Sequence, residues 1–171
     1  IRMNVVKIVV KDTRRALAEF AVALYVTPSE RLNLIGVTGT KGKTTTTYLI
    51  KSALSDGDDK GALIGSIANF VGDTEYPATH TTPESPQIND LLRRAFDAGY
   101  TFGVMEASSH SLSLQRVHKL RFKVAVFTNL GSDHLDFHKT REDYLAAKKI
   151  LFDGLDQDAF ALINADDENS P

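Results

Sequence analysis

Residues 32–47 constrain the fold more than any other segment, because an apolar run leads directly into a glycine-rich loop and then into helical sequence. Residues 32–37 have the length and composition of a buried strand, and residues 44–54 predict a helix. The sequence GVTGTKGKTTTT at residues 36–47 is typical of a phosphate-binding loop, yet it departs from the pattern G-x-x-x-x-G-K-[ST]. Val37 stands where that pattern has its first glycine, and the nearby glycines are Gly36 and Gly39.

The remainder of the chain alternates strand-like and helix-like segments. Apolar runs predict further strands at residues 5–10, 62–66, 101–107, 122–130 and 159–165. Helical spacing predicts helices at residues 12–25, 88–96 and 141–152, with loops at 67–86, which includes a short hairpin, and at 131–140. In the first helix Leu17, Phe20 and Leu24 recur at helical spacing behind a cap at Asp12 or Thr13. This order is typical of an α/β fold with a mostly parallel sheet, helices on both faces and a small additional antiparallel sheet.

Composition limits the partners that this chain can have. Its 171 residues are 42% hydrophobic, enough for one substantial core, and we expect a lead-in over residues 1–30 and one domain over residues 31–171. The formal net charge is −2 with both signs interspersed, which argues against nucleic-acid and membrane partners. The absence of cysteine excludes disulfides and thiolate metal sites. We expect no signal peptide or membrane span, a cytoplasmic location and a monomer.

Three polar clusters follow predicted strands directly. They are the glycine-rich loop after residues 32–37, EASSH after residues 101–105, and TNLGSDHLD after residues 123–127. Ligands of open parallel sheets bind at the carboxyl ends of the strands, where such clusters meet. The sequence therefore predicts one site at one edge of the sheet.

The glycine-rich loop has the residues that phosphate binding needs. Gly39 and Gly42 would let backbone N–H groups approach phosphate oxygens, and the following helix would direct its positive end at them. Lys43 would supply a mobile cation, and Thr44 a hydroxyl ligand for magnesium. The alternative is a glycine-rich turn with a solvated lysine. The order of strand, loop and helix favours a nucleotide site.

The arrangement of glycines in this loop resembles that of a known protein family. TGTKGKTT resembles the loop T-G-T-x-G-K-[ST]-T of the Mur ligases and folylpolyglutamate synthetases. HTTPES, VMEASSHSL, VFTNLGSDHLDFHKT and YLAAKKILF are similar, in the same order, to segments of the UDP-N-acetylmuramyl-tripeptide synthetases, the Mur ligases that add the third amino acid of the peptidoglycan peptide. This resemblance begins near Val9. It implies a P-loop type Mur ligase central domain that binds ATP.

Glu106 and His134 are the candidate magnesium ligands. Glu106 ends an apolar strand, where a carboxylate would either hold magnesium beside the phosphates or be solvated. His134 follows Asp133 on the same edge and would otherwise be a surface histidine; the resemblance makes it a ligand for a second magnesium ion. His134 and His138 are four residues apart, as in zinc sites, but Leu135 replaces the glutamate of H-E-x-x-H and no third ligand is evident.

Lys148 lies on the apolar side of the predicted helix at residues 141–152. At about 100° per residue Lys148 falls near the centre of the apolar stripe, and Lys149 falls near its edge. An inward lysine either extends along apolar surface to water or becomes neutral, and a neutral amine can react with carbon dioxide. The resemblance implies a carbamylated Lys148 that helps to hold the second magnesium ion. The stripe consists of Tyr144, Leu145, Leu151 and Phe152.

The resemblance also implies contacts with both substrates. The expected ATP-binding residues are Gly39, Thr40, Lys41, Gly42, Lys43, Thr44, Thr45 and Asn129. The expected residues for the UDP-muramyl dipeptide are Thr81, Thr82, Ser108 and Arg116. Two positions depart from the family: Leu114, where some relatives have glutamine, and Lys41, where asparagine is common.

The implied reaction is ATP-dependent amide-bond formation through an acyl phosphate, with Lys43, Glu106, His134 and Lys148 as catalytic residues. The acceptor would be UDP-N-acetylmuramoyl-L-alanyl-D-glutamate, and the incoming group an amino acid whose identity depends on a C-terminal domain. We expect this chain to be a fragment, without the N-terminal and C-terminal domains of the family, that binds nucleotide weakly and forms no amide bonds. The alternatives are a folylpolyglutamate synthetase-like ligase and a noncatalytic ATP-binding module.

Overall fold

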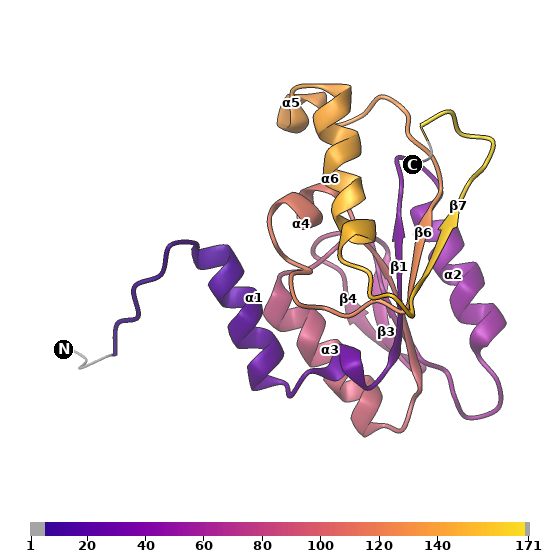
Figure 1. Ribbon diagram of the computed structural model, residues 1–171. Helices are drawn as coiled ribbons and strands as arrows, with labels where there is room; N and C mark the ends of the chain where they lie inside the picture. Colours follow the sequence, from indigo (N-terminus) through magenta and orange to yellow (C-terminus); the bar gives the residue numbers. More distant parts are fainter. Residues whose placement is uncertain (1–5, 170–171) are drawn as a thin grey trace.

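The structure is a computed structural model that describes residues 6–169. A seven-stranded sheet with the order β4-β3-β2-β5-β1-β6-β7 forms its centre (Figure 1). β2, β5, β1, β6 and β7 are parallel, whereas β3 and β4 are antiparallel. The strands are β1 Asn33–Thr38, β2 Ala62–Ile64, β3 Ala68–Val71, β4 Thr74–Pro77, β5 Phe102–Glu106, β6 Val124–Phe127 and β7 Phe160–Ile163. The mostly parallel α/β fold is confirmed, but the antiparallel hairpin extends the same sheet and forms no separate one.

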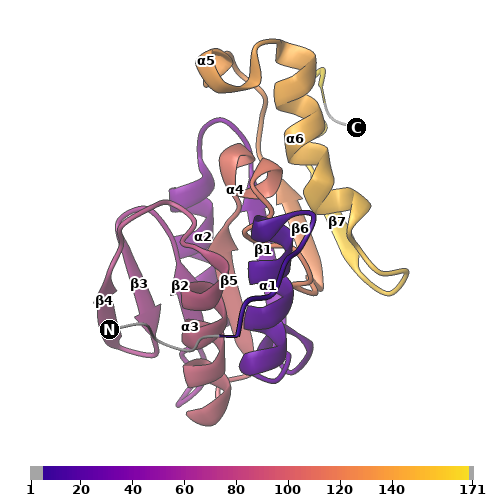
Figure 2. The same cartoon turned by 90° about the vertical axis from the view of Figure 1, so that its left-hand side faces the viewer.

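Helices cover both faces of the sheet. Figure 1 shows α2 on one side and α3, α4 and α6 on the other, and Figure 2 shows α1 beside α3. Beneath α2 the core contains Val37 and Val104, and the larger core beneath α3 and α6 contains Leu34, Leu92 and Met105. The helices are α1 Thr13–Leu24, α2 Lys43–Leu54, α3 Ser85–Asp97, α4 Ser109–Ser113, α5 Leu135–His138 and α6 Arg141–Asp153, with a 3-10 turn, η1, at Pro28–Glu30.

The lead-in differs from its prediction. Residues 6–10 form no strand and are exposed, since no strand of the described sheet lies beside them; Val5 lies outside the described residues. Asp12 caps α1 as predicted, and its carboxylate accepts hydrogen bonds from the backbone N–H groups of the first turn. The predicted stripe of α1 is exposed, however: Leu17, Phe20 and Leu24 are 44%, 55% and 75% exposed. α1 instead buries Ala18, Ala21 and Val22, and it packs mainly on α3.

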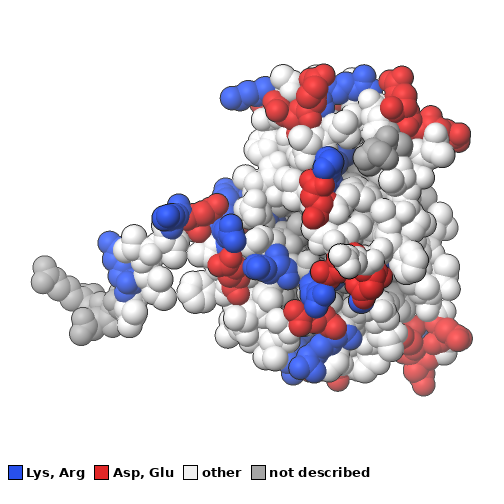
Figure 3. All heavy atoms as spheres, viewed as in Figure 1, with Lys and Arg blue, Asp and Glu red and all other residues white. Residues whose placement is uncertain are grey.

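Elsewhere the predicted order of elements is confirmed, with local differences. The segment at residues 131–140 contains the short helix α5, and the strand predicted at residues 122–130 is only four residues long. Lysine, arginine, aspartate and glutamate are interspersed on the face shown in Figure 3, with no broad patch of one sign. Among the described residues, no helix has the length and apolar composition that crossing a bilayer requires.

Gly36, the first glycine of the loop sequence, is a packing residue within β1. A Cβ at this position would lie 2.8 Å from Phe122 Cε1 and 3.1 Å from Leu151 Cδ1. We expect Gly36→Ala to lower the free energy of unfolding by about 1–3 kcal/mol, because the core has no room for the methyl group. Urea unfolding measures this change. Gly154→Ala is the matched control, since the nearest atom to its Cβ is 3.5 Å away; equal stability of the two variants would contradict the packing role.

Candidate functional site

The three polar clusters meet at one edge of the sheet, as predicted. β1 lies between β5 and β6, with Val37 opposite Glu106 and Thr38 opposite Phe127. Thr40 N–H donates to the Asn129 carbonyl at 2.9 Å, so the glycine-rich loop contacts the segment after β6. Parallel register therefore brings the ends of these strands together.

The loop between β1 and α2 has a backbone that suits an anion. Gly39 has φ +147° and Gly42 has φ +86°, conformations that favour glycine. A Cβ on Gly39 would lie 1.9 Å from Thr128 Oγ1, so only glycine fits there. Gly42 precedes α2, whose first turn has no side-chain cap. Its N–H groups and the helix dipole can therefore bind a phosphate.

Lys43 folds back across this loop. Its Nζ donates to the carbonyls of Gly39 and Thr40 at 2.9 and 3.1 Å. Burial lowers the pKa of Lys43 below its usual value, while the charges of Glu106 and Asp133 oppose that shift. The ammonium thus lies at the loop, within a short movement of any phosphate bound there.

Asn129 and Thr128 hold the loop through its backbone. The Asn129 side chain accepts from Lys41 N–H at 3.0 Å and donates to the Lys41 carbonyl at 3.0 Å. Thr128 Oγ1 donates to the same carbonyl at 2.7 Å. The Lys41 side chain is exposed, so the conformation of the loop depends on the backbone of residue 41 and not on its side chain. Sequence reasoning missed Thr128, whose only signal was its position directly after β6.

Glu106 is a buried carboxylate beside the loop. It is 1% exposed, and its Oε1 accepts from Thr44 Oγ1 at 3.0 Å and from Ser66 N–H at 2.8 Å. Ser66 Oγ also donates to Oε2 at 3.2 Å. No ion pair of the described residues includes Glu106. A buried anion without a paired cation, next to a loop hydroxyl, fits a hard cation such as Mg²⁺. Sequence reasoning missed Ser66.

Gly65 leaves the space that this carboxylate occupies. A Cβ on Gly65 would lie 2.6 Å from Glu106 Oε1. We expect Gly65→Ala to displace the carboxylate and to weaken Mg²⁺-dependent ADP binding about tenfold. Isothermal titration with ADP, with and without Mg²⁺, measures the effect. An unchanged response to Mg²⁺ would show that the position of this carboxylate does not matter.

The four predicted acceptor-binding residues lie next to Glu106. Thr82 Oγ1 donates to the Glu106 carbonyl at 2.8 Å and accepts from Ser108 N–H at 3.1 Å. Arg116 donates to the Thr82 carbonyl at 2.9 Å and pairs with Glu84 at 2.8 Å. Thr82 is 1% exposed, so it holds these segments together. Thr81 and Ser108 are half-buried: the Thr81 hydroxyl is 3.0 Å from Ser66 Oγ, and the Ser108 hydroxyl accepts from Ser111 N–H at 3.1 Å at the start of α4.

His134 belongs to a cluster of rings beyond the loop. It has φ +55°, and its ring centroid is 4.7 Å from that of His110. His138 packs on His110 and Tyr144, is 6% exposed, and has a buried Nε2 without a hydrogen-bond partner. The Tyr144 hydroxyl is 3.1 Å from Thr40 Oγ1. The cluster therefore contacts the glycine-rich loop. In residues 6–169, no group of three or more histidine or carboxylate side chains is arranged to hold a metal ion.

Lys148 is inward-facing, as the spacing of α6 predicted. It is 1% exposed, and its Nζ lies 4.2 Å from the centroid of the Tyr144 ring. Burial, and then the charge of Lys43, lowers the pKa of Lys148 from its usual 10.5 to about 7, while Asp133 opposes this shift. The lysine does not extend to water, and its lowered pKa favours the neutral amine more than in an exposed lysine. Lys149, by contrast, is exposed and pairs with Asp153.

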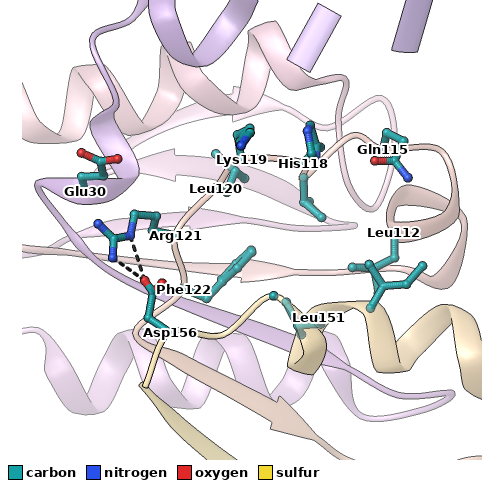
Figure 4. Close-up of a pocket in the computed structure, with 13 residues that line it drawn as sticks. Glu30, Leu112, Gln115, His118, Lys119, Leu120, Arg121, Phe122, Leu151 and Asp156 are labelled. Carbon is teal, nitrogen blue, oxygen red and sulfur yellow. Dashed lines mark hydrogen bonds and ion pairs between the residues drawn. The ribbon is translucent and has the colours of Figure 1, made fainter. Parts of the chain in front are cut away.

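A cavity among the described residues lies away from these side chains. It has a volume of about 490 Å³, and Leu112, Phe122 and Leu151 contribute to its lining. Figure 4 shows Arg121 paired with Asp156 at this cavity. None of the predicted site residues lines it.

Comparisons with known proteins agree on one family. The model of the Mur ligase middle domain matches residues 37–171. A UDP-N-acetylmuramoyl-L-alanyl-D-glutamate--2,6-diaminopimelate ligase of Chlorobaculum tepidum is 51% identical over 96% of this chain and 32% of the relative. One of the same name from Phocaeicola vulgatus is 45% identical over 97% of this chain and 34% of the relative. A solved structure of a ligase with this name has a TM-score of 0.77 and 33% identity, covering 94% of this chain and 33% of its own. The chain thus spans about a third of the length of the relatives it matches.

Proposed function

This chain belongs to the Mur ligase family, and from this premise we propose that it is the nucleotide-binding part of a ligase that extends the peptide of a peptidoglycan precursor. The acceptor is UDP-N-acetylmuramoyl-L-alanyl-D-glutamate, and the names of the relatives favour 2,6-diaminopimelate as the incoming amino acid. We propose a cytoplasmic monomer that needs ATP and Mg²⁺.

One observation carries this proposal. The buried carboxylate of Glu106 accepts a hydrogen bond from Thr44 of the phosphate loop, and the loop lysine, Lys43, is close enough for their charges to interact. A glycine-rich loop, a buried carboxylate and a lysine ammonium therefore lie at one edge of the sheet. Thr81 and Ser108, which are bonded to Ser66 and Thr82, lie beside them and would contact an acceptor. Such a site suits phosphoryl transfer from ATP to an acceptor.

The reaction proceeds by acyl activation. The terminal glutamate carboxylate of the acceptor attacks the γ-phosphorus of ATP, so that an acyl phosphate forms and ADP leaves. The amine of the incoming amino acid then attacks the acyl carbon, phosphate leaves, and the ammonium proton is lost to water. Lys43 and the N–H groups of the first turn of α2 would hold the transferred phosphoryl group, and Thr44 with Glu106 would hold an Mg²⁺ ion that supplies positive charge there.

The remaining residues have roles in binding. Thr44 and Glu106 would hold one Mg²⁺, and His134 with a carbamylated Lys148 would hold a second. Tyr144, which contacts both Thr40 and Lys148, links that second site to the loop. The acceptor would contact Thr81, Ser108 and Arg116, while the buried Thr82 would hold these three residues in place. ATP would contact Gly39, Thr40, Lys41, Gly42, Lys43, Thr44 and Thr45, with Asn129 supporting the loop.

ADP and phosphate release test the function. We would compare this chain with a chimera in which it replaces the matching third of the Chlorobaculum relative. Given ATP, Mg²⁺, UDP-muramyl dipeptide and diaminopimelate, the chimera is expected to release phosphate and form the amide, and the chain alone to bind nucleotide without turnover. Activity of the chimera only with a folate acceptor and glutamate would indicate a folylpolyglutamate synthetase. ATP binding without phosphate release with any acceptor would indicate a noncatalytic module.

A further inference from the structure

Ser66 lies between the candidate cation ligand and a candidate acceptor ligand. Its N–H and hydroxyl donate to the two oxygens of Glu106 at 2.8 and 3.2 Å. The same hydroxyl oxygen is 3.0 Å from Thr81 Oγ1. We propose that Ser66 is a positioning residue that orients the Glu106 carboxylate for a divalent cation and joins it to Thr81 in one hydrogen-bonded unit. This inference rests on the proposed function.

The single proton of the Ser66 hydroxyl is consistent with a hydrogen-bonded unit of Thr81, Ser66 and Glu106. Ser66 Oγ carries a single proton, and an ionised carboxylate can only accept. Both contacts of the hydroxyl are satisfied together when Thr81 donates to Ser66 and Ser66 donates to Glu106. A hydroxyl that accepts one hydrogen bond donates a stronger one, so Thr81 reinforces the hold of Ser66 on the carboxylate.

The bonds to Glu106 also determine where a cation can bind. A carboxylate has about four lone-pair directions, and Thr44 with Ser66 N–H takes two of them at Oε1. The Ser66 hydroxyl takes one at Oε2, which leaves one direction at that oxygen for a cation. Thr44 donates its proton to Glu106, so its oxygen lone pairs also remain available to the same cation.

Hydrogen bonds of the adjacent Gly65 fix the position of the backbone at Ser66. Gly65 N–H donates to Asn69 Oδ1 at 3.2 Å, and Asn69 Nδ2 donates to the Pro77 carbonyl at 3.3 Å. Asn69 is fully buried and lies on β3, which pairs with β4. The antiparallel hairpin at the edge of the sheet therefore anchors the turn that presents Ser66 to Glu106.

The test is the Mg²⁺ dependence of ADP binding by this chain, measured by titration calorimetry. Mg²⁺ is expected to increase the affinity of the wild-type chain for ADP, and this increase is the gain that we compare between variants. We expect the gain to be about tenfold smaller in Ser66→Ala, and ADP binding without Mg²⁺ to be unchanged. Ser66→Thr keeps the hydroxyl and is expected to restore the gain. Ile67→Ala is the matched control, because Ile67 is the next residue and is 70% exposed. Thermal unfolding of each variant shows that it is folded.

A double-mutant cycle with Thr81→Val tests the unit itself. We expect Thr81→Val alone to reduce the gain about threefold and to add nothing in the Ser66→Ala background. The inference would be overturned if Ser66→Ala left the gain unchanged, or if it weakened ADP binding equally without Mg²⁺. Additive effects of the two substitutions on the gain would also overturn it. If the wild-type chain fails to bind ADP even with Mg²⁺, the proposed function fails as well, whereas normal Mg²⁺-dependent binding in Ser66→Ala overturns this inference alone.

Discussion

At pH 7 the variant Lys148→Met is expected to be more stable than the wild-type protein by several kcal/mol and to be inactive in the ligase chimera. Lys148 is 1% exposed, and its pKa is lowered to about 7, mainly by burial, because the charged form loses its hydration. Methionine has a similar length and carries no charge, so it removes this penalty. Activity is lost because the variant has no amine to carry the proposed carbamate.

The sign of the stability difference between Lys148→Met and the wild type follows from the pH dependence of unfolding. The pKa of Lys148 is about 7 in the folded protein and 10.5 ordinarily, so the unfolded chain binds more protons between these two values. Wild-type stability relative to Lys148→Met therefore rises from pH 7 to pH 10.5 and is constant below pH 7. At about 1.4 kcal/mol per pKa unit, the difference at pH 7 is on the order of 4–5 kcal/mol and disappears near pH 10.5.

Urea unfolding from pH 6 to pH 10.5 in carbon dioxide-free buffer measures this difference. Lys149→Met is the matched control, since Lys149 is the next residue on α6 and is exposed. Parallel profiles for Lys148→Met and the wild type would contradict the burial of a neutral amine. Added bicarbonate at pH 8 is expected to stabilise only proteins that retain Lys148, because carbamate formation favours the folded state. A carbamate signal in ¹³C NMR with labelled bicarbonate would identify the product directly.

Lys43→Met is expected to weaken Mg²⁺-ADP binding by roughly 30-fold to 150-fold. Lys43 Nζ bonds two carbonyls of the phosphate loop and lies where it can reach a bound phosphate. A charge-assisted hydrogen bond to phosphate contributes about 2–3 kcal/mol, which corresponds to this loss of affinity. Titration calorimetry of this chain with ADP and Mg²⁺ measures the effect.

Lys41→Met is the comparison for Lys43, because both lysines belong to the same loop. Lys41 contacts Asn129 and Thr128 through its backbone, and its side chain is exposed, so we expect at most about a threefold loss of affinity. Equal losses in the two variants would mean that general positive charge, and not the position of Lys43, determines binding. A small loss in Lys41→Met would instead explain how this position can hold a lysine where asparagine is common in the family.

Local periodicity predicted most of the fold. The order of strand, glycine-rich loop and helix at residues 32–54 is encoded in adjacent residues, and so is the inward side of α6 that contains Lys148. The face that α1 buries was not predictable, because the stripe of Leu17, Phe20 and Leu24 has the same spacing as a buried one. Only the position of α3 determines that α1 packs through Ala18 and Ala21.

Residues close together in the chain predicted the mostly parallel sheet and the order of strand, glycine-rich loop and helix, while the resemblance to the Mur ligases supplied the candidate ligands. The contacts that surround the candidate ligands depend on the tertiary structure. Ser66 reaches Glu106 across 40 residues of sequence, and Thr128 supports the loop at Lys41 across 87. Such contacts have no periodicity, because they arise where parallel strands end at a common edge. Burial of Lys148 against Tyr144 likewise sets its pKa, and burial depends on the packed core and not on residue type.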